Sequence, residues 1–221
     1  EGDITVSEAD GGMGILAEAG RTGDIINSGT ILIDEDYEAE DDDDDGDADG
    51  PFAEGSDRYA IRIAEGGTFT GTVDNSGTID VFGNDSSGIA IDSALDGSLL
   101  SSGSIDLVGD DGQGIRAGDV SGDVSVTGAV IARGENSVAV DLSGDIGGQL
   151  VIQNTVAASG YRSLTAPSDT DDLDEDDLLQ GGPAIRIAGN VAGGILLDVA
   201  PDDEDEDEDS EHNLSLAALE E

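Results

Sequence analysis

The chain contains no cysteine, no lysine and no tryptophan, and it has a single histidine, His212. The lack of cysteine excludes disulfide bonds, thiol nucleophiles and thiolate metal sites. One histidine also excludes a multi-histidine metal site within one copy of the chain. No apolar run approaches the roughly 18–20 residues of a transmembrane helix, so we expect no membrane insertion in this segment. Function must therefore be argued from architecture and from carboxylates.

Positive charge is almost as scarce. The 221 residues include 53 acidic residues against 7 arginines, which gives a formal net charge of −46. A surface this acidic is repelled by phosphate backbones and by anionic lipid. Nucleic-acid binding through a basic surface is therefore excluded.

About half of the acid lies in three runs, at 34–49, 169–177 and 202–211. Outside these runs the chain is rich in Ile, Val, Leu, Gly, Ser and Thr, with apolar residues in alternation, so this remainder is able to fold. The chain starts at Glu1 without the basic start, apolar run and cleavage site of a signal peptide. We expect residues 1–221 to be a single segment excised from a longer chain.

Three short elements recur along the sequence, and such internal repeats are typical of solenoids. The first is NSGTI at 27–31, repeated at 75–79 and, more loosely, at 101–105, 126–130 and 153–156. The second is AIRI at 60–63, with equivalents at 88–91, 114–117, 137–140 and 184–187. The third follows a glycine corner at 71–73, 97–99, 122–124, 148–150 and 194–196.

Each element alternates apolar and polar residues over three to five positions and is bounded by Gly, Asn, Asp or Ser, which indicates strands. Helical periodicity is nearly absent before 214–219. Stacking equivalent strands about 4.8 Å apart gives each one a partner above and below. The sequence therefore predicts an all-β fold, a parallel β-solenoid (β-helix) of about six turns. In it, Ile61, Ile89, Ile115, Val138 and Ile185 point inward in one column, while Arg62, Ala90, Arg116, Ala139 and Arg186 point outward.

The acidic runs interrupt the repeats at one corner only, between the NSGTI and AIRI elements. We expect acidic insertions at 34–58, 157–182 and 200–212, after which 213–216 (NLSL) fits the AIRI position. A solenoid tolerates insertions at one corner because the loop leaves the coil without disturbing the stack. Although 214–219 could form a short helical cap, the open ends are expected to need a neighbour, from further repeats or from end-to-end self-association.

The NSGTI pattern at 25–31 and 73–79, with its looser echoes, resembles the repeats of bacterial autotransporter passenger domains and related β-helical surface proteins. The resemblance covers most of the chain. It implies passage across the outer membrane and display outside the bacterial cell, toward a host or cell-surface ligand. The lack of cysteine fits such secretion, because a disulfide would obstruct threading. The membrane anchor would lie beyond Glu221 or be absent.

Three interpretations of the acidic runs stay open: a self-repelling bristle that confers solubility, weak binding of Ca²⁺ at several sites, and a surface for a basic partner. The short corners at 83–88, 109–114 and 134–136 offer better-ordered ligands. Stacking would bring Asp85, Asp110, Asp111 and Glu135 into one column with Asn84, where cations could bridge the repelling carboxylates. Asp and Asn are also ordinary turn residues. The interpretation of these five residues as ordinary turn residues, without a bound cation, is the more economical one.

The outward arginines Arg62, Arg116 and Arg186 have two interpretations: an anionic-glycan site, or pairing with carboxylates of the acidic loops, which we favour. Enzymatic activity is not expected. Polysaccharide-processing β-helix enzymes are the alternative, and they need paired carboxylates at a fixed separation. Here acid is too abundant to be diagnostic, aromatic residues amount to 3%, and no nucleophile or nucleotide motif occurs. The sequence therefore favours a non-catalytic structural or adhesive segment.

Overall fold

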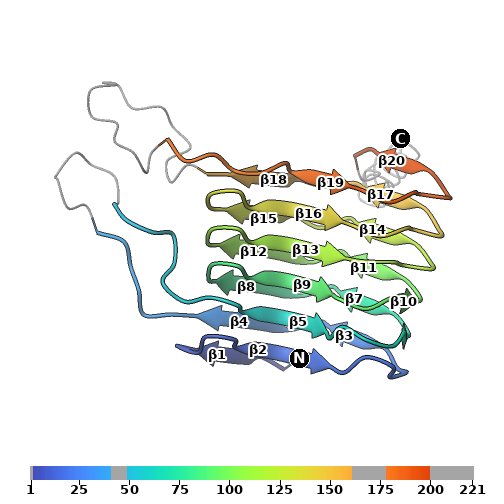
Figure 1. The fold of residues 1–221 in the computed structure, drawn as a ribbon, viewed down its shortest axis with the longest axis horizontal. Helices are drawn as coiled ribbons and strands as arrows, with labels where there is room; N and C mark the ends of the chain where they lie inside the picture. The colour runs from blue at the N-terminus through green and yellow to red at the C-terminus, as the bar shows by residue number, and fades with distance from the viewer. Residues whose placement is uncertain (1, 41–48, 161–177, 200–221) are drawn as a thin grey trace, which may run out of the picture.

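The chain winds into a parallel β-solenoid of six coils (Figure 1), seen in a computed structural model that describes residues 2–40, 49–160 and 178–199. Each coil contributes one strand to each of three six-stranded parallel sheets, and the described residues form no helix. The predicted all-β solenoid of about six turns is therefore confirmed. Its strands are short because each coil must turn three corners.

The first sheet is made by the NSGTI elements, the second by the AIRI elements and the third by the strands after the glycine corners. The strands of the first sheet are β1 (Ile4–Ser7), β4 (Thr30–Asp34), β8 (Thr78–Phe82), β12 (Ser104–Val108), β15 (Val130–Arg133) and β18 (Val156–Ser159). The second sheet contains β2 (Met13–Ala17), β5 (Tyr59–Ile63), β9 (Ser87–Ile91), β13 (Gln113–Ala117), β16 (Val138–Leu142) and β19 (Ile185–Ile187). The third contains β3 (Ile25–Asn27), β7 (Val73–Asn75), β11 (Leu99–Ser101), β14 (Val124–Val126), β17 (Leu150–Ile152) and β20 (Ile195–Leu197), and the pair β6 (Phe69–Thr70) and β10 (Leu95–Asp96) lies between the second and third sheets.

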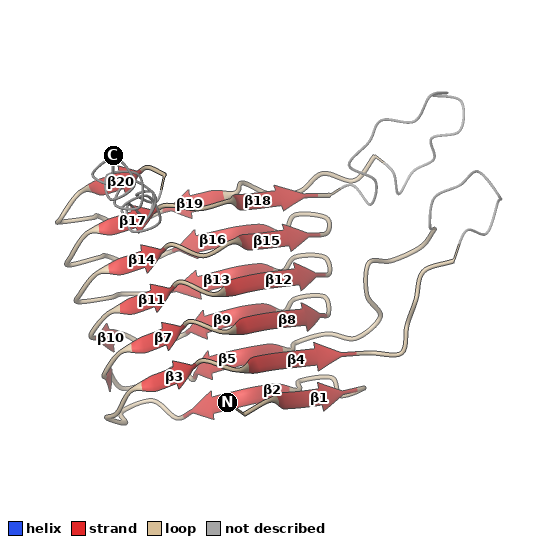
Figure 2. Cartoon of the chain, turned by 180° about the vertical axis from the view of Figure 1, so that it is seen from behind, coloured by secondary structure: helices blue, strands red, loops and turns tan. Residues whose placement is uncertain are grey.

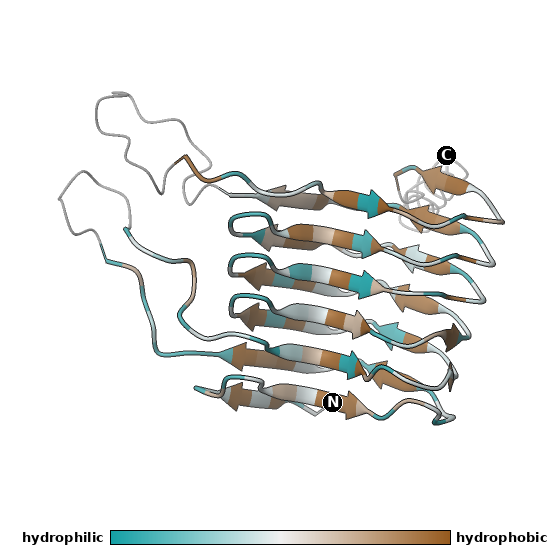
Figure 3. Cartoon of the chain, in the orientation of Figure 1, coloured by the Kyte–Doolittle hydropathy of each residue, from teal (hydrophilic) through white to brown (hydrophobic). Residues whose placement is uncertain are grey.

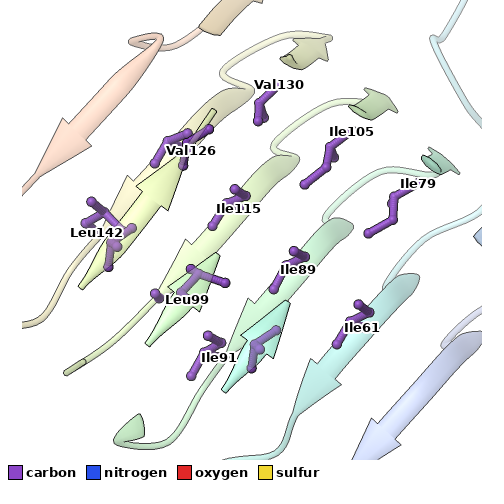
Figure 4. Packing of buried hydrophobic residues seen from close by; sticks show 14 of the residues in the cluster. Ile61, Ile79, Ile89, Ile91, Leu99, Ile105, Ile115, Val126, Val130 and Leu142 are labelled. Carbon is purple, nitrogen blue, oxygen red and sulfur yellow. The ribbon is translucent and has the colours of Figure 1, made fainter. Parts of the chain in front are cut away.

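Aliphatic residues at equivalent positions stack inside the solenoid and form its core (Figures 3 and 4). In the second sheet, Ile61, Ile89 and Ile115 are register partners in successive coils, and all three are fully buried. In the first sheet, Ile79 lies between Ile31 and Ile105 in the same way. Removing such side chains from water is the main source of stability in this fold.

Two predicted alignments are wrong by one or two residues. Ile115 pairs with Val140 and not with Val138, so that Asp141, and not Ala139, occupies the outward position beside Arg116. In the last coil, Leu150 pairs with Ile195, whereas the sequence alignment placed Leu196 there. Both errors have one cause: several adjacent apolar residues satisfy a period-two pattern in more than one register.

A column of glycine and alanine brings the second sheet close to the first. A Cβ at Gly88 would lie 2.6 Å from Ile105 Cγ2, and one at Gly114 would lie 2.5 Å from Val130 Cγ1. The same position carries Ala60 and Ala139, which are fully buried. Larger side chains there would push the two sheets apart, so the column fixes their separation.

Candidate functional site

The corner between the first and second sheets, here called the loop edge, carries two very different connections (Figure 2). Tight turns join β8 to β9, β12 to β13 and β15 to β16, whereas long insertions separate β4 from β5 and β18 from β19. The first two predicted insertions therefore leave the solenoid at one edge, as expected. The second begins later than 157–182, because β18 continues to Ser159, and the predicted insertion at 200–212 lies outside the described residues.

The tight turns use left-handed backbone at one equivalent position in each coil. Asp85, Asp111 and Asn136 have φ angles of 52°, 54° and 57°. Asn and Asp tolerate this region better than other non-glycine residues, because their short polar side chains bond locally. Two of the four predicted metal ligands, Asp85 and Asp111, therefore occupy positions that the turn itself explains.

The residue before each of these positions links one coil to the next. The Asp110 backbone N–H donates to Asn84 Oδ1 (2.8 Å), and the Glu135 backbone N–H donates to Asp110 Oδ1 (2.7 Å). A similar ladder runs along the corner between the second and third sheets, where Asp119 Oδ1 accepts from the Asp145 N–H (2.9 Å). Side-chain oxygens thus satisfy backbone donors that the turns would leave unpaired.

The structure places Asp85, Asp110, Asp111 and Glu135 in consecutive coils, as predicted, but it does not gather them around one point. Asp85, Asp111 and Glu135 are exposed, and Asp110 is half-buried with Oδ1 engaged in the ladder. Within the ranges 2–40, 49–160 and 178–199, no group of three or more His, Cys, Asp or Glu side chains could hold a metal ion. Calcium binding by these four residues stays a prediction.

A buried ion pair at the base of the first insertion was not foreseen. Arg58 Nη1 lies 2.8 Å from Glu35 Oε2, and the two side chains are only 3% and 4% exposed. Arg58 Nη1 also donates to the Phe82 carbonyl oxygen (2.9 Å), while the Glu35 carboxylate accepts from the backbone N–H groups of Glu54 and Gly55 (2.9 Å each). Both stems of the insertion are therefore joined to each other and to the solenoid.

Apolar packing supports this base. Phe52 and Ala53 are buried, and Asn84 Nδ2 donates to the Ala53 carbonyl oxygen (2.7 Å). The bristle interpretation is therefore wrong at the base of the insertion, where Glu35 and residues 52–58 are held against the solenoid. The bristle interpretation stays open for residues 41–48 and 161–177, which lie outside the described residues.

The outward arginines form ion pairs, as predicted, but their partners are residues of the solenoid itself. Asp92 accepts from both Arg62 (2.9 Å) and Arg116 (2.7 Å). The guanidinium of Arg62 also lies 4.2 Å from the centre of the Tyr59 ring. Arg186 pairs with Asp141, and their hydrogen bond raises the pKa of the Arg186 guanidinium. These arginines therefore join neighbouring coils and do not reach into the acidic insertions.

Asp80 and Asp106 are register partners on the outer face of the first sheet. Burial raises the pKa of Asp80 above its ordinary value, and the negative charge of Asp106 raises it further. Arg133, 2.7 Å from Asp106, pairs with that carboxylate. The fold therefore disfavours the ionised form of the Asp80 carboxyl group.

We expect Asp80→Asn to stabilise the folded chain at pH 7 by up to about 0.5 kcal/mol, the scale of a surface substitution. Because the folded-state pKa of Asp80 is raised, the wild type lacks this stability at neutral pH and regains it as the pH falls through that pKa. The advantage of the variant should therefore disappear in acid. Urea unfolding of both proteins at pH 7 and pH 4 measures the difference, and a less stable variant at pH 7 would contradict the assignment.

Aromatic side chains do not line an exposed surface in the part of the chain that the structure describes. Phe52, Tyr59 and Phe69 are buried, and Tyr37 and Phe82 are half-buried. Tyr161 lies outside the described residues. The part of the chain that the structure describes also contains no helix that could cross a membrane.

No family model matches the chain, and no curated protein or solved structure is significantly similar to it.

Proposed function

We propose that this chain is a non-catalytic, extracellular structural or adhesive segment that presents acidic loops along one edge of a rigid β-solenoid. The observation that carries the proposal is the base of the first insertion. Its Arg58–Glu35 ion pair is buried, so the loop leaves the solenoid in a fixed direction. A loop needed only for solubility would not require such a base.

The spacing of the two insertions supports display by the solenoid. They follow β4 and β18, which are separated by four strand steps in the order β4, β8, β12, β15 and β18. At about 4.8 Å per step, the two points of exit lie about 19 Å apart. The hydrogen-bonded stack keeps this distance constant, so a partner could contact both acidic loops at once.

Location at the bacterial cell surface, as in an autotransporter passenger, is part of the same proposal. It is supported by the resemblance of the NSGTI repeats and by the absence of cysteine. The ligand would belong to a host or neighbouring cell surface.

The adhesive role is tested by exposing the immobilised chain to an array of cell-surface glycans and cationic peptides. A matched variant replaces every Asp and Glu in 41–48 and 169–177 by Asn and Gln, which keeps the loop lengths. We expect the wild type to retain at least one probe and the variant to lose it, with unchanged circular dichroism. Release of reducing sugars from a glycan would instead indicate the polysaccharide-processing enzyme, and retention by both proteins would exclude the acidic loops as the binding surface.

Calcium binding by the acidic loops is the second part of the proposal. Carboxylate oxygens suit Ca²⁺, and extracellular modules bind it with a Kd of roughly 10⁻⁴ to 10⁻³ M. We expect calorimetric titration to show saturable binding in this range for the wild type and loss of most sites in the same charge-neutralised variant. Ca²⁺ at 100 times Kd should also add about 2.7 kcal/mol per site that forms only in the folded state. A titration that cannot be told from ionic-strength-matched NaCl would remove calcium from the account.

A further inference from the structure

A shallow groove runs along the corner between the second and third sheets, on the side of the solenoid away from the acidic insertions (Figure 1). The chain turns inward here once per coil, and the inward residues Leu95 and Val120 are bridged to each other and only 1% exposed. The residues before and after each inward position form two walls, which enclose about 290 Å³. One wall contains Thr68, Ala94, Asp119 and Asp145, and the other contains Asp96, Ser121 and Gly147.

The floor of the groove is apolar, whereas three carboxylates stand on its walls. Asp119 and Asp145 are exposed in successive coils on one wall, and Asp96 is exposed on the other. None of the ion pairs between described residues includes these carboxylates, although arginines neutralise acidic residues on the outer faces of the first and second sheets. The groove therefore combines an apolar floor with negative charge that the described chain does not neutralise.

Each of these carboxylates uses only one of its oxygens within the solenoid. Asp119 Oδ1 accepts from the Asp145 backbone N–H (2.9 Å), and Asp145 Oδ1 accepts from the Asn190 backbone N–H (2.7 Å). Asp96 Oδ1 accepts from the Ser121 hydroxyl (2.9 Å). Among the described residues no donor bonds to the three Oδ2 atoms, so these oxygens can accept from a ligand while the coils stay linked.

An apolar floor beside fixed carboxylates suits a cation with an aliphatic stem. Ammonium-bearing chains bury their methylene groups along apolar surface and keep the charged group at the rim. The net charge of −46 also concentrates cations around the chain. A space of about 290 Å³ is at the lower limit of ligand pockets, which favours a thin small molecule over a folded partner.

We propose that this groove binds a linear aliphatic polyamine, with its methylene groups over the apolar floor and one ammonium group at each of Asp119 and Asp145. The inward residues beside these carboxylates, Val120 and Ile146, are bridged in neighbouring coils, so the carboxylates are one strand step, about 4.8 Å, apart. Ammonium nitrogens separated by three methylene groups are about 5 Å apart in an extended chain with bonds of about 1.5 Å. The repeat of such a ligand therefore matches the repeat of the coils, and Asp96 lies on the opposite wall.

NMR titration of the intact chain with bis(3-aminopropyl)amine tests the proposal, at an ionic strength of about 0.15 M that screens long-range attraction. We expect saturable shift changes at the amides of Asp96, Val120 and Asp145. Ca²⁺ at the same ionic strength has no aliphatic stem and should not reproduce them. This map needs no substitution, and it separates the groove from the acidic insertions at the other corner, so its outcome does not depend on the proposed function.

Two double variants remove the same charge and keep an oxygen acceptor at each substituted position. Asp119→Asn/Asp145→Asn changes the groove. Asp3→Asn/Asp24→Asn is the matched control, because both residues are exposed in the first coil and their Oδ1 atoms also accept backbone N–H groups of the next coil. We expect the groove variant to bind the triamine about fivefold to tenfold more weakly, the effect of losing two exposed ion pairs, and the control to stay within about twofold of the wild type.

Three results would overturn the proposal. Equal affinities of the two double variants for the triamine would show attraction by net charge without a site in the groove. Shift changes that miss the groove, or that Ca²⁺ reproduces, would show that the groove does not select an aliphatic polyamine. A lysine tripeptide that bound more tightly than the triamine, with the same loss in the groove variant, would identify a basic peptide as the occupant.

Discussion

Replacing Arg58 by alanine is expected to lower the free energy of unfolding by about 3–5 kcal/mol, the usual cost of leaving one partner of a buried ion pair behind. Glu35 would remain as a carboxylate with a side chain only 4% exposed, and the Phe82 carbonyl oxygen would lose a donor. Urea unfolding at pH 7 measures the change. The same variant should also release the stems of the first insertion, so proteolysis within 49–57 should become faster.

Arg62→Ala is the matched control for this substitution. The Arg62 side chain is 27% exposed, and its partner Asp92 keeps a second ion pair with Arg116. We expect its loss to cost at most about 1 kcal/mol, as for surface pairs. If the two alanine variants were equally stable, the base of the insertion would not be part of the folded body, and the proposed directional display would lose its support.

Gly103→Ala is expected to destabilise the fold by about 1–3 kcal/mol or more, because it overpacks a contact between two coils. A Cβ at Gly103 would overlap the Gly77 carbonyl oxygen, and Gly128 meets Gly103 in the same way one coil further on. Neither backbone can retreat, because the flanking strands β11 and β12 are hydrogen-bonded on both sides. Thermal unfolding by circular dichroism provides the measurement.

The neighbouring residue offers the control. Ser102 is exposed, so Ser102→Ala should change the stability by no more than about 0.5 kcal/mol. A Gly103→Ala variant as stable as Ser102→Ala would mean that the coils are not stacked as closely as the NSGTI repeat requires.

The repeats allowed the coil number, the parallel strands and most of the core to be predicted. Ile61, Ile89 and Ile115 could be aligned from sequence because each lies in a short apolar element bounded by turn residues. Val138 could not, because 137–142 alternates equally well in two registers, and only the position of the outward Asp141 beside Arg186 distinguishes them.

The candidate site was less predictable. The loop edge followed from the spacing of the insertions, whereas the Arg58–Glu35 pair joins residues 23 positions apart in an acidic run with several possible partners. One signal was present: Arg58 is the single base in 34–58 and follows the apolar Ala53 by five residues. Asp85, Asp110, Asp111 and Glu135 lie in consecutive coils, but the bonding of Asp110 to the next coil depends on side-chain directions that periodicity does not contain.

Distances between spin labels on the outer face of the third sheet test the central claim most directly, since the chain has no cysteine of its own. Ile26, Val151 and Leu196 occupy one outward column, in the first, fifth and sixth coils. Stacked coils predict Cα separations of about 19 Å for the 26–151 pair and about 24 Å for the 26–196 pair. A broad distribution for both pairs, or a 26–196 separation that exceeds the 26–151 separation by much more than one strand step, would contradict the solenoid and the fixed display of its acidic loops.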